Sequence, residues 1–150
     1  MKLANALMER AELQTKIRQL GNRLMNNAQV QEGEKPVEDP AFLPKELDDA
    51  YAALELLIGR INRTNSETVV KGESLTALLA RRDCLAGKNG ILRQFSDEAS
   101  ALVSRRTVGE IKIKSTVDVR QLQKQIDALS KELRELDALI QETNWTTELL

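Results

Sequence analysis

The segment VDVRQLQKQIDALSKELRELDALI, residues 117–140, decides the fold class. Its apolar residues recur in alternating steps of three and four, which places them along one seam of a long α-helix. The seam residues are Val119, Leu122, Ile126, Leu129, Leu133, Leu136 and Ile140. Asp118 and Gln121 resemble a capping box at the start of this helix, and Val117 and Leu122 can form a hydrophobic staple. An apolar seam this narrow is buried only against other helices.

Three more seams of this kind precede residues 117–140. They predict one helix from Lys2 to about Ala28, a second from Pro44 to about Asn65, and a third that begins near Ser74. The first seam is Leu3, Ala6, Arg10, Leu13, Ile17, Leu20, Leu24 and Asn27; the second is Leu47, Tyr51, Leu54, Leu57 or Ile58, and Ile61. The third is Leu75, Leu78, Arg82, Leu85, Asn89, Leu92, Ser96, Ala99 and Val103.

The first two helices are separated by a loop at residues 29–43, QVQEGEKPVEDPAFL. Pro36 and Pro40 interrupt any helix there, because proline lacks a backbone donor and disfavours helix in the residue before it. The acids of this segment lack the spacing of a calcium loop, so we expect a solvated, flexible stretch. These acids are Glu32, Glu34, Glu38 and Asp39.

Two short segments have the character of β-strands. Residues 68–70 are β-branched and are followed by Lys71 and Gly72, which predicts a strand and a turn. Residues 110–114, EIKIK, alternate with period two, so we expect them to pair with the first segment. The predicted fold is therefore mainly α: one domain over residues 1–150, a long-helix antiparallel bundle or coiled coil of about four helices with a small two-stranded β-ribbon.

Composition narrows the classes of partner. Half of the residues are Ala, Glu, Lys, Leu or Arg, as in long-helix proteins, and only 3% are aromatic. Twenty-two basic and 23 acidic residues give no field that would attract nucleic acid or an anionic membrane. The sequence shows no signal-peptide pattern and no apolar run of membrane-spanning length. We expect a cytoplasmic protein without nucleic-acid or membrane partners. We also expect a homo-oligomer, because long seams bury poorly in a monomer, and leave another protein partner open.

The sequence lacks the residues that most catalytic mechanisms require. The absence of histidine removes Ser–His and Cys–His pairs and histidine-bound zinc, and Gly87-Lys88 lacks the rest of a phosphate loop. We therefore predict no catalytic residue, cofactor or metal, and expect no enzyme. Cys84, the single cysteine, is expected to be a small buried residue; a reactive thiol beside Arg81 and Arg82 is the alternative.

One set of polar residues is the candidate site. If the helices alternate in direction, the end of the second, the start of the third and the end of the fourth meet. The predicted cluster is Asn62, Arg63, Asn65, Arg81, Arg82, Asp83, Asn144 and Trp145.

This cluster has three interpretations. In the first, its members satisfy one another, with Arg81 or Arg82 paired to Asp83 or Glu142, since buried charge needs a partner. In the second, polar seam residues set the register of an oligomeric coiled coil; these are Arg10, Asn27, Arg82 and Asn89. In the third, arginines at a helix N-terminus hold an anion or a small ligand.

Several stretches in this order resemble a known family. MKLANALMERAELQ, NNAQVQEGEKP, INRTN, SLTALLARRDCL and LRELDALIQETNW are similar to a bacterial family of uncharacterised small helical proteins that is often labelled septicolysin-like. The resemblance supports the fold and the length, and its label implies a cytolysin. It supplies no catalytic residues.

The function hypothesis is a self-associating helical interaction or structural protein. One alternative is a septicolysin-like cytolysin or membrane-active protein, to which the amphipathic helices would contribute. The other is an anion- or small-ligand-binding protein or enzyme that uses the Arg/Asn cluster.

Overall fold

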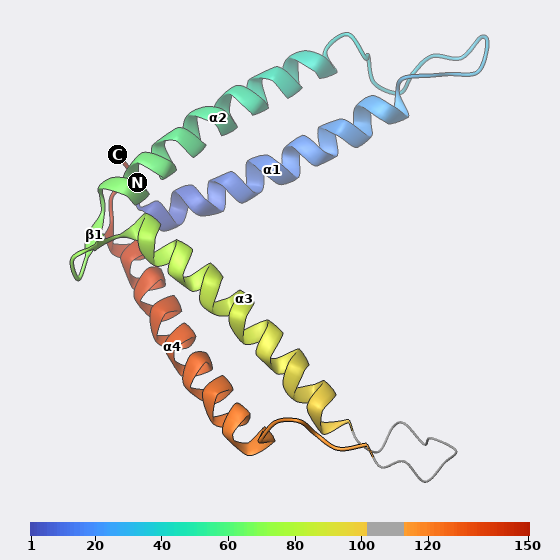
Figure 1. Cartoon of the computed structure of the whole chain (residues 1–150). Coiled ribbons are helices and arrows are strands. Elements are labelled where there is room, and N and C mark those ends of the chain that lie inside the picture. Colours follow the sequence, from blue (N-terminus) through green and yellow to red (C-terminus); the bar gives the residue numbers. More distant parts are fainter. Residues whose placement is uncertain (102–112) are drawn as a thin grey trace. The chain divides into compact units, whose positions relative to one another are not determined.

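The computed structural model describes residues 1–101 and 113–150, and within them the chain is mainly α-helical. Its elements are α1 (Leu3–Asn26), α2 (Leu43–Glu67), β1 (Val69–Val70), β2 (Glu73–Ser74), α3 (Leu75–Ser100) and α4 (Val119–Thr146). The four long helices pack antiparallel in two pairs, α1 with α2 and α3 with α4 (Figure 1). The predicted fold class is confirmed.

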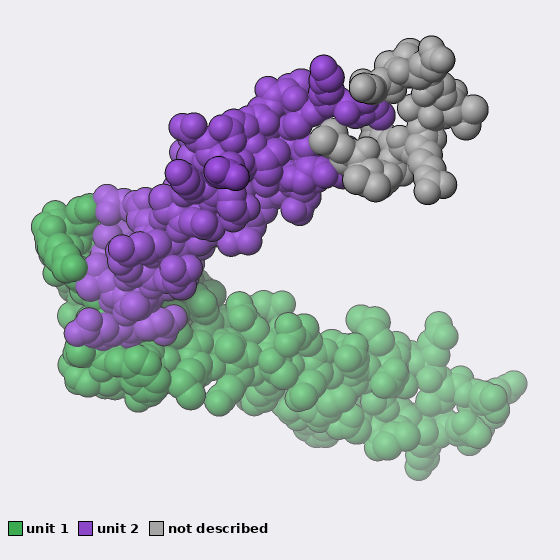
Figure 2. Space-filling view, turned by 90° about the horizontal axis from the view of Figure 1, so that it is seen from below, with its two compact units in different colours: residues 1–74, 143–150 green, residues 75–142 purple. Residues whose placement is uncertain are grey.

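The chain divides into two compact units. Unit 1 is Met1–Ser74 with Thr143–Leu150, and unit 2 is Leu75–Glu142 (Figure 2). The last residues of α4 therefore belong to unit 1. The prediction of one domain for residues 1–150 concerns independent folding, which this division does not test.

Unit 1 is built on the seam between α1 and α2. Leu20, Leu43 and Ala50 form its buried cluster, with Ile17 and Leu47 among the half-buried residues packed against it. The predicted place of Tyr51 in this seam is wrong, because Tyr51 is 54% exposed and Ala50 is 4% exposed. The smaller side chain occupies the position that faces α1, and α2 begins with Pro44 in its first turn, as predicted.

The loop between α1 and α2 is anchored by polar contacts. Arg23 Nε donates to both carboxylate oxygens of Glu38, at 3.1 and 3.0 Å, and Arg23 Nη1 donates to Glu46 Oε2 at 3.3 Å. Asn27 donates to the Arg23 carbonyl at 2.9 Å and accepts the Glu38 backbone N–H at 2.9 Å. Glu38 is thus a fixed loop residue, which corrects the expectation of a solvated, flexible acidic stretch at this point.

The two-stranded ribbon is a tight hairpin. Val69 pairs with Ser74 and Val70 with Glu73, joined by Lys71 and Gly72, whose φ angles are both positive. Positive φ at both central residues suits the twist of a two-residue hairpin. β1 therefore pairs with β2 and not with the predicted partner, residues 110–114. The hairpin is favoured because closing a short loop costs less entropy than closing a long one. Residues 110–112 lie outside the described part, and Ile113 and Lys114 are irregular.

Both ends of unit 1 are tied together. The Leu3 N–H donates to the Thr147 carbonyl at 2.9 Å, the Leu149 N–H donates to the Met1 carbonyl at 2.8 Å, and Lys2 Nζ lies 2.7 Å from Glu148 Oε1. The hydrogen bond from Lys2 is the first cause that holds the pKa of Glu148 below its usual value. These contacts fix residues 143–150 beside the start of α1.

Unit 2 is the antiparallel pair α3 and α4. Asn89 contacts Ser130, and Arg82 lies 4.0 Å from Asp137. One heptad along α3 therefore corresponds to one heptad backwards along α4, which is the relation in an antiparallel coiled coil. Asp118 Oδ1 accepts the N–H groups of Arg120 and Gln121 at 3.0 and 3.1 Å, which confirms Asp118 as the cap of α4. The return bond from Gln121 and the staple of Val117 with Leu122 stay predictions.

Replacing Glu38 with Gln tests the loop anchor through pH. The hydrogen bonds from Arg23 lower the pKa of Glu38 below its usual 4.5. Its stabilisation is therefore fully present above that usual value and is lost as pH falls through the lowered folded-state pKa. We expect the wild-type melting temperature to exceed that of Glu38→Gln at pH 7 and the gap to close in acid.

The control for this measurement is Glu34→Gln, which changes an exposed acid of the same loop. A gap for Glu38→Gln that stays constant from pH 7 to pH 3 would show that the charge of Glu38 contributes nothing.

Candidate functional site

The predicted cluster residues of unit 1 lie at the end of α2 and the end of α4. Arg63 is exposed and pairs with Glu67 one turn later, Nε to Oε1 at 2.9 Å. Asn62 is exposed and Asn65 half-buried, whereas Asn144 is 8% exposed and Trp145 is 55% exposed.

The other cluster residues lie on α3, in unit 2. Nε and Nη2 of Arg82 both donate to Asp83 Oδ1, at 3.0 and 2.8 Å, and Asp137 lies 4.0 Å away. The Arg82–Asp83 pair of the structural interpretation is therefore present, and the charge of Arg82 is balanced. Arg81 is exposed. Because Asn62 and its neighbours belong to unit 1, a single cluster that joins both sets stays a prediction.

Cys84, on the same stretch of α3, is exposed. The expectation that it is a small buried residue is wrong. Its turn of α3 directs Leu85 into partial burial and leaves Cys84 on the solvent side, since neighbouring residues of a helix differ by about 100° in direction.

A buried polar contact lies farther along the seam of unit 2. Asn89 is 7% exposed, and its Nδ2 donates to Ser130 Oγ at 3.1 Å; Arg93 Nη2 donates to the same hydroxyl at 3.0 Å. The Asn89 Oδ1 atom is buried without a hydrogen-bond partner. Asn89 thus joins α3 to α4 within one chain, the kind of contact that fixes helix register at a cost in stability.

The other predicted register residues differ from Asn89. Asn27 ends α1 and holds the loop through Glu38, and Arg10 Nε is buried without a hydrogen-bond partner. Their role in an oligomeric seam stays a prediction.

An open groove of about 470 Å³ lies on the outer face of α2. Its lining is Ala52, Glu55, Leu56, Gly59, Arg60, Arg63 and Leu150. Arg60 Nε donates to the Leu150 carbonyl at 2.8 Å, and the buried Thr64 hydroxyl accepts the Leu150 N–H at 3.0 Å. These contacts hold Leu150 as one wall of the groove. Of the predicted cluster, Arg63 alone lines it.

The sequence carries a readable signal for this groove. Ala52, Leu56, Gly59 and Arg63 follow steps of four, three and four on α2, so they share one helix face. The stripe predicted for this helix contains only its strongest apolar residues and does not include this second one.

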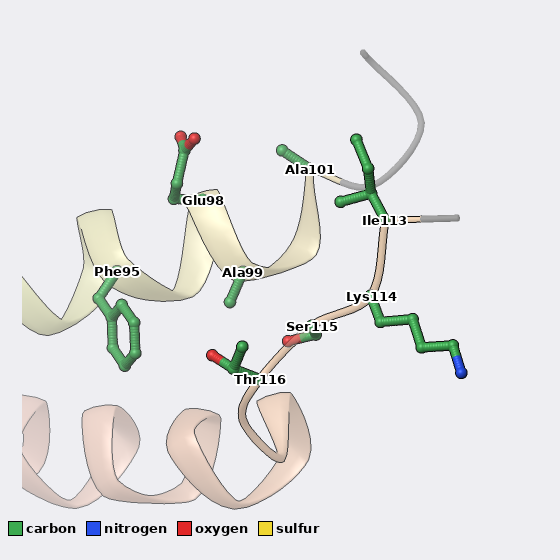
Figure 3. A pocket seen from close by; sticks show the side chains of 8 residues that line it. All are labelled: Phe95, Glu98, Ala99, Ala101, Ile113, Lys114, Ser115 and Thr116. Atoms are coloured by element: carbon green, nitrogen blue, oxygen red, sulfur yellow. The ribbon is translucent and has the colours of Figure 1, made fainter. Parts of the chain in front are cut away.

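A smaller cavity of about 220 Å³ lies at the end of α3. Phe95 and Ala99 extend from α3 towards Thr116, whereas the side chains of Glu98 and Lys114 point away (Figure 3). The charged lining residues thus diverge, which gives a bound ion no convergent partners.

Comparison with known proteins places the chain in a family. A sequence model described as a family of unknown function, DUF6847, matches residues 10–149. The chain belongs to this family. The resemblance to an uncharacterised family is confirmed at that level.

A relative whose structure has been solved has the same fold as this chain. It is described as the crystal structure of a functionally unknown conserved protein from Corynebacterium diphtheriae, is 38% identical, and superposes with a TM-score of 0.95. The match covers 100% of this chain and 99% of that one. No curated protein matches the sequence. In the part of the chain that the structure describes, no helix is both long and apolar enough to cross a membrane.

Two substitutions test the buried contact in unit 2. Asn89→Leu removes an unpaired buried carbonyl and should raise the free energy of unfolding by about 1–3 kcal/mol, whereas Ser130→Ala leaves the Asn89 amide unpaired and should lower it by about as much. Urea unfolding followed by circular dichroism measures both changes. Loss of stability in Asn89→Leu would mean that Asn89 Oδ1 has a partner, such as an ordered water.

Proposed function

We propose that this chain is a self-associating helical interaction module. The observation that carries the proposal is the exposed apolar surface on the helix pair of unit 1. Met8 on α1 is 56% exposed, and Leu56 on α2 is 68% exposed. Contact with another protein surface removes such apolar side chains from water, which favours association.

The architecture of each unit explains why this surface is uncovered. A helix that packs against a single partner buries one stripe, so apolar residues on its other faces stay in water. On α2 the buried stripe is Leu43, Ala50, Leu54, Leu57, Ile61 and Thr64. Leu56 lies off this stripe, next to the small residues Ala52 and Gly59 in the groove. A partner that covers Leu56 would remove its apolar area from water.

The charge balance favours a protein as that partner. Twenty-two basic and 23 acidic residues provide no net attraction to a polyanion. Exposed charges on α2 also occur as pairs of opposite sign, Lys45 with Asp49 and Arg63 with Glu67. Such a surface suits a partner with alternating charges, and a second copy of this chain has them.

Two alternatives differ from self-association in what they bind. One is a septicolysin-like membrane-active protein, as the label of the similar family implies. Such a protein would use exposed apolar residues to insert into lipid and would release dye from vesicles. An anion- or small-ligand-binding protein would use the Arg/Asn cluster. This second alternative has less support, because Arg63 and Arg82 already pair with Glu67 and Asp83.

Light scattering across a dilution series tests self-association. We expect the mass of two or more chains at high concentration and a fall towards one chain on dilution, since an association equilibrium shifts with protein concentration. The series is run with and without phosphate, and dye release from vesicles is measured in parallel. A mass of one chain at every concentration would overturn the proposal. Dye release at micromolar protein would favour the membrane-active alternative. A melting temperature that rises with phosphate would favour the ligand-binding alternative.

A further inference from the structure

Helix α2 carries a second stripe that is exposed along its whole length. This outer stripe follows steps of three and four and consists of Lys45, Asp49, Ala52, Leu56, Gly59, Arg63 and Glu67. At about 100° per residue it lies roughly opposite the stripe that α2 buries against α1. Helix α2 therefore has the periodicity of a helix with two contact faces, of which α1 covers one.

The middle of the outer stripe combines a protruding side chain with a hollow. Leu56 is 68% exposed, and the small residues Ala52 and Gly59 on either side of it line the groove of about 470 Å³. This arrangement can complement itself, because the small residues beside each Leu56 leave room for the Leu56 side chain of a second copy. Small residues at such a position let two helices approach closely.

We propose that a second copy of this chain docks on the outer stripe, with the two α2 helices antiparallel and a two-fold axis near Leu56. This inference rests on the proposed self-association and names its surface. Two-fold contacts use the same patch on both subunits, so the patch must complement itself.

The charges at the two ends of the stripe favour the antiparallel orientation. With the axis at Leu56, Asp49 lies level with the partner's Arg63, and Lys45 lies level with the partner's Glu67. A parallel, in-register pair would instead place each charge opposite its own copy, and like charges in register repel. The charge order along α2 thus fits one of the two orientations.

Gly59 has no evident role within its own chain. A Cβ atom added there would meet no atom within 4 Å, and its φ angle is not in the left-handed region. Glycine in an exposed helix interior is also unfavourable relative to other residues. Gly21, Gly87 and Gly90 are equally open, so the place of Gly59 beside Leu56 on the outer stripe is what distinguishes it: there a glycine lets a second helix approach closely.

The contact should be weak. The outer stripe is about 33 Å long at 1.5 Å per residue. A single helix face of this length is at the low end of specific interfaces, so we expect a dissociation constant of about micromolar size.

Two pairs of matched variants test the surface. Gly59→Gln fills the groove, and Gly87→Gln makes the same change at an exposed glycine of α3 whose added Cβ also meets no atom. Leu56→Glu and Ile91→Glu each place a charge at a side chain that is 68% exposed. Light scattering over a dilution series measures the dissociation constant, and circular dichroism checks that each variant folds.

We expect Gly59→Gln and Leu56→Glu to raise the dissociation constant at least tenfold and the α3 variants to leave it within twofold. Unchanged association in both α2 variants would overturn the docking surface while leaving self-association intact. A wild-type chain that stays monomeric would overturn both, so the two failures are distinguishable.

A charge exchange tests the orientation. Asp49→Arg places two arginines at the same level in the antiparallel pair and should weaken association. Adding Arg63→Asp to the same chain restores opposite charges and should recover the wild-type dissociation constant. Failure of the double variant to recover association, with the fold intact, would rule out the antiparallel arrangement.

Discussion

Two packed antiparallel helices can bury only one stripe of each helix, and the rest of this structure depends on how that stripe is filled. In unit 1 it is filled by side chains such as Leu20, Leu43 and Ala50. In unit 2 the seam also contains Asn89, which is nine-tenths buried. A narrow seam provides limited apolar burial, so contacts outside it take a larger share in holding the chain in one arrangement.

Those outside contacts lie where the helices end. Arg23, Asn27 and Glu38 fix the loop after α1, and the strand-like bridge between Lys2 and Glu148 fixes the residues after α4. Exposed ion pairs of this kind individually contribute little. Their effect here is geometric, because each holds a segment outside the helices against a neighbouring helix end.

The sequence predicts well what depends on neighbouring residues. The heptad pattern of α4 and its Asp118 cap, Pro44 at the start of α2 and the Lys71–Gly72 turn are all readable, because local spacing and backbone preference determine them. It does not predict partners that are distant along the chain. Arg23 could pair with any of several acids, and the choice of Glu38 depends on the path of the loop.

The candidate site divides in the same way. The Arg82–Asp83 pair involves adjacent residues and could be predicted, whereas the groove on α2 depends on Leu150, which Arg60 and Thr64 hold in place by hydrogen bonds. The predictions for Tyr51 and Cys84 are wrong because residue type alone does not decide between adjacent helix positions. Which way a residue faces depends on the exact phase of the stripe.

Three features of α2 contribute little or nothing to the stability of the helix by itself, and all three lie on its outer stripe. Gly59 lowers helix propensity, and Leu56 exposes apolar area to water. The ion pairs Lys45–Asp49 and Arg63–Glu67 place the base before the acid, which is the weaker order for residues four apart. A second helix against this stripe would turn each feature into an advantage, because it would use the glycine for close approach, cover the leucine and meet the charges with opposite ones.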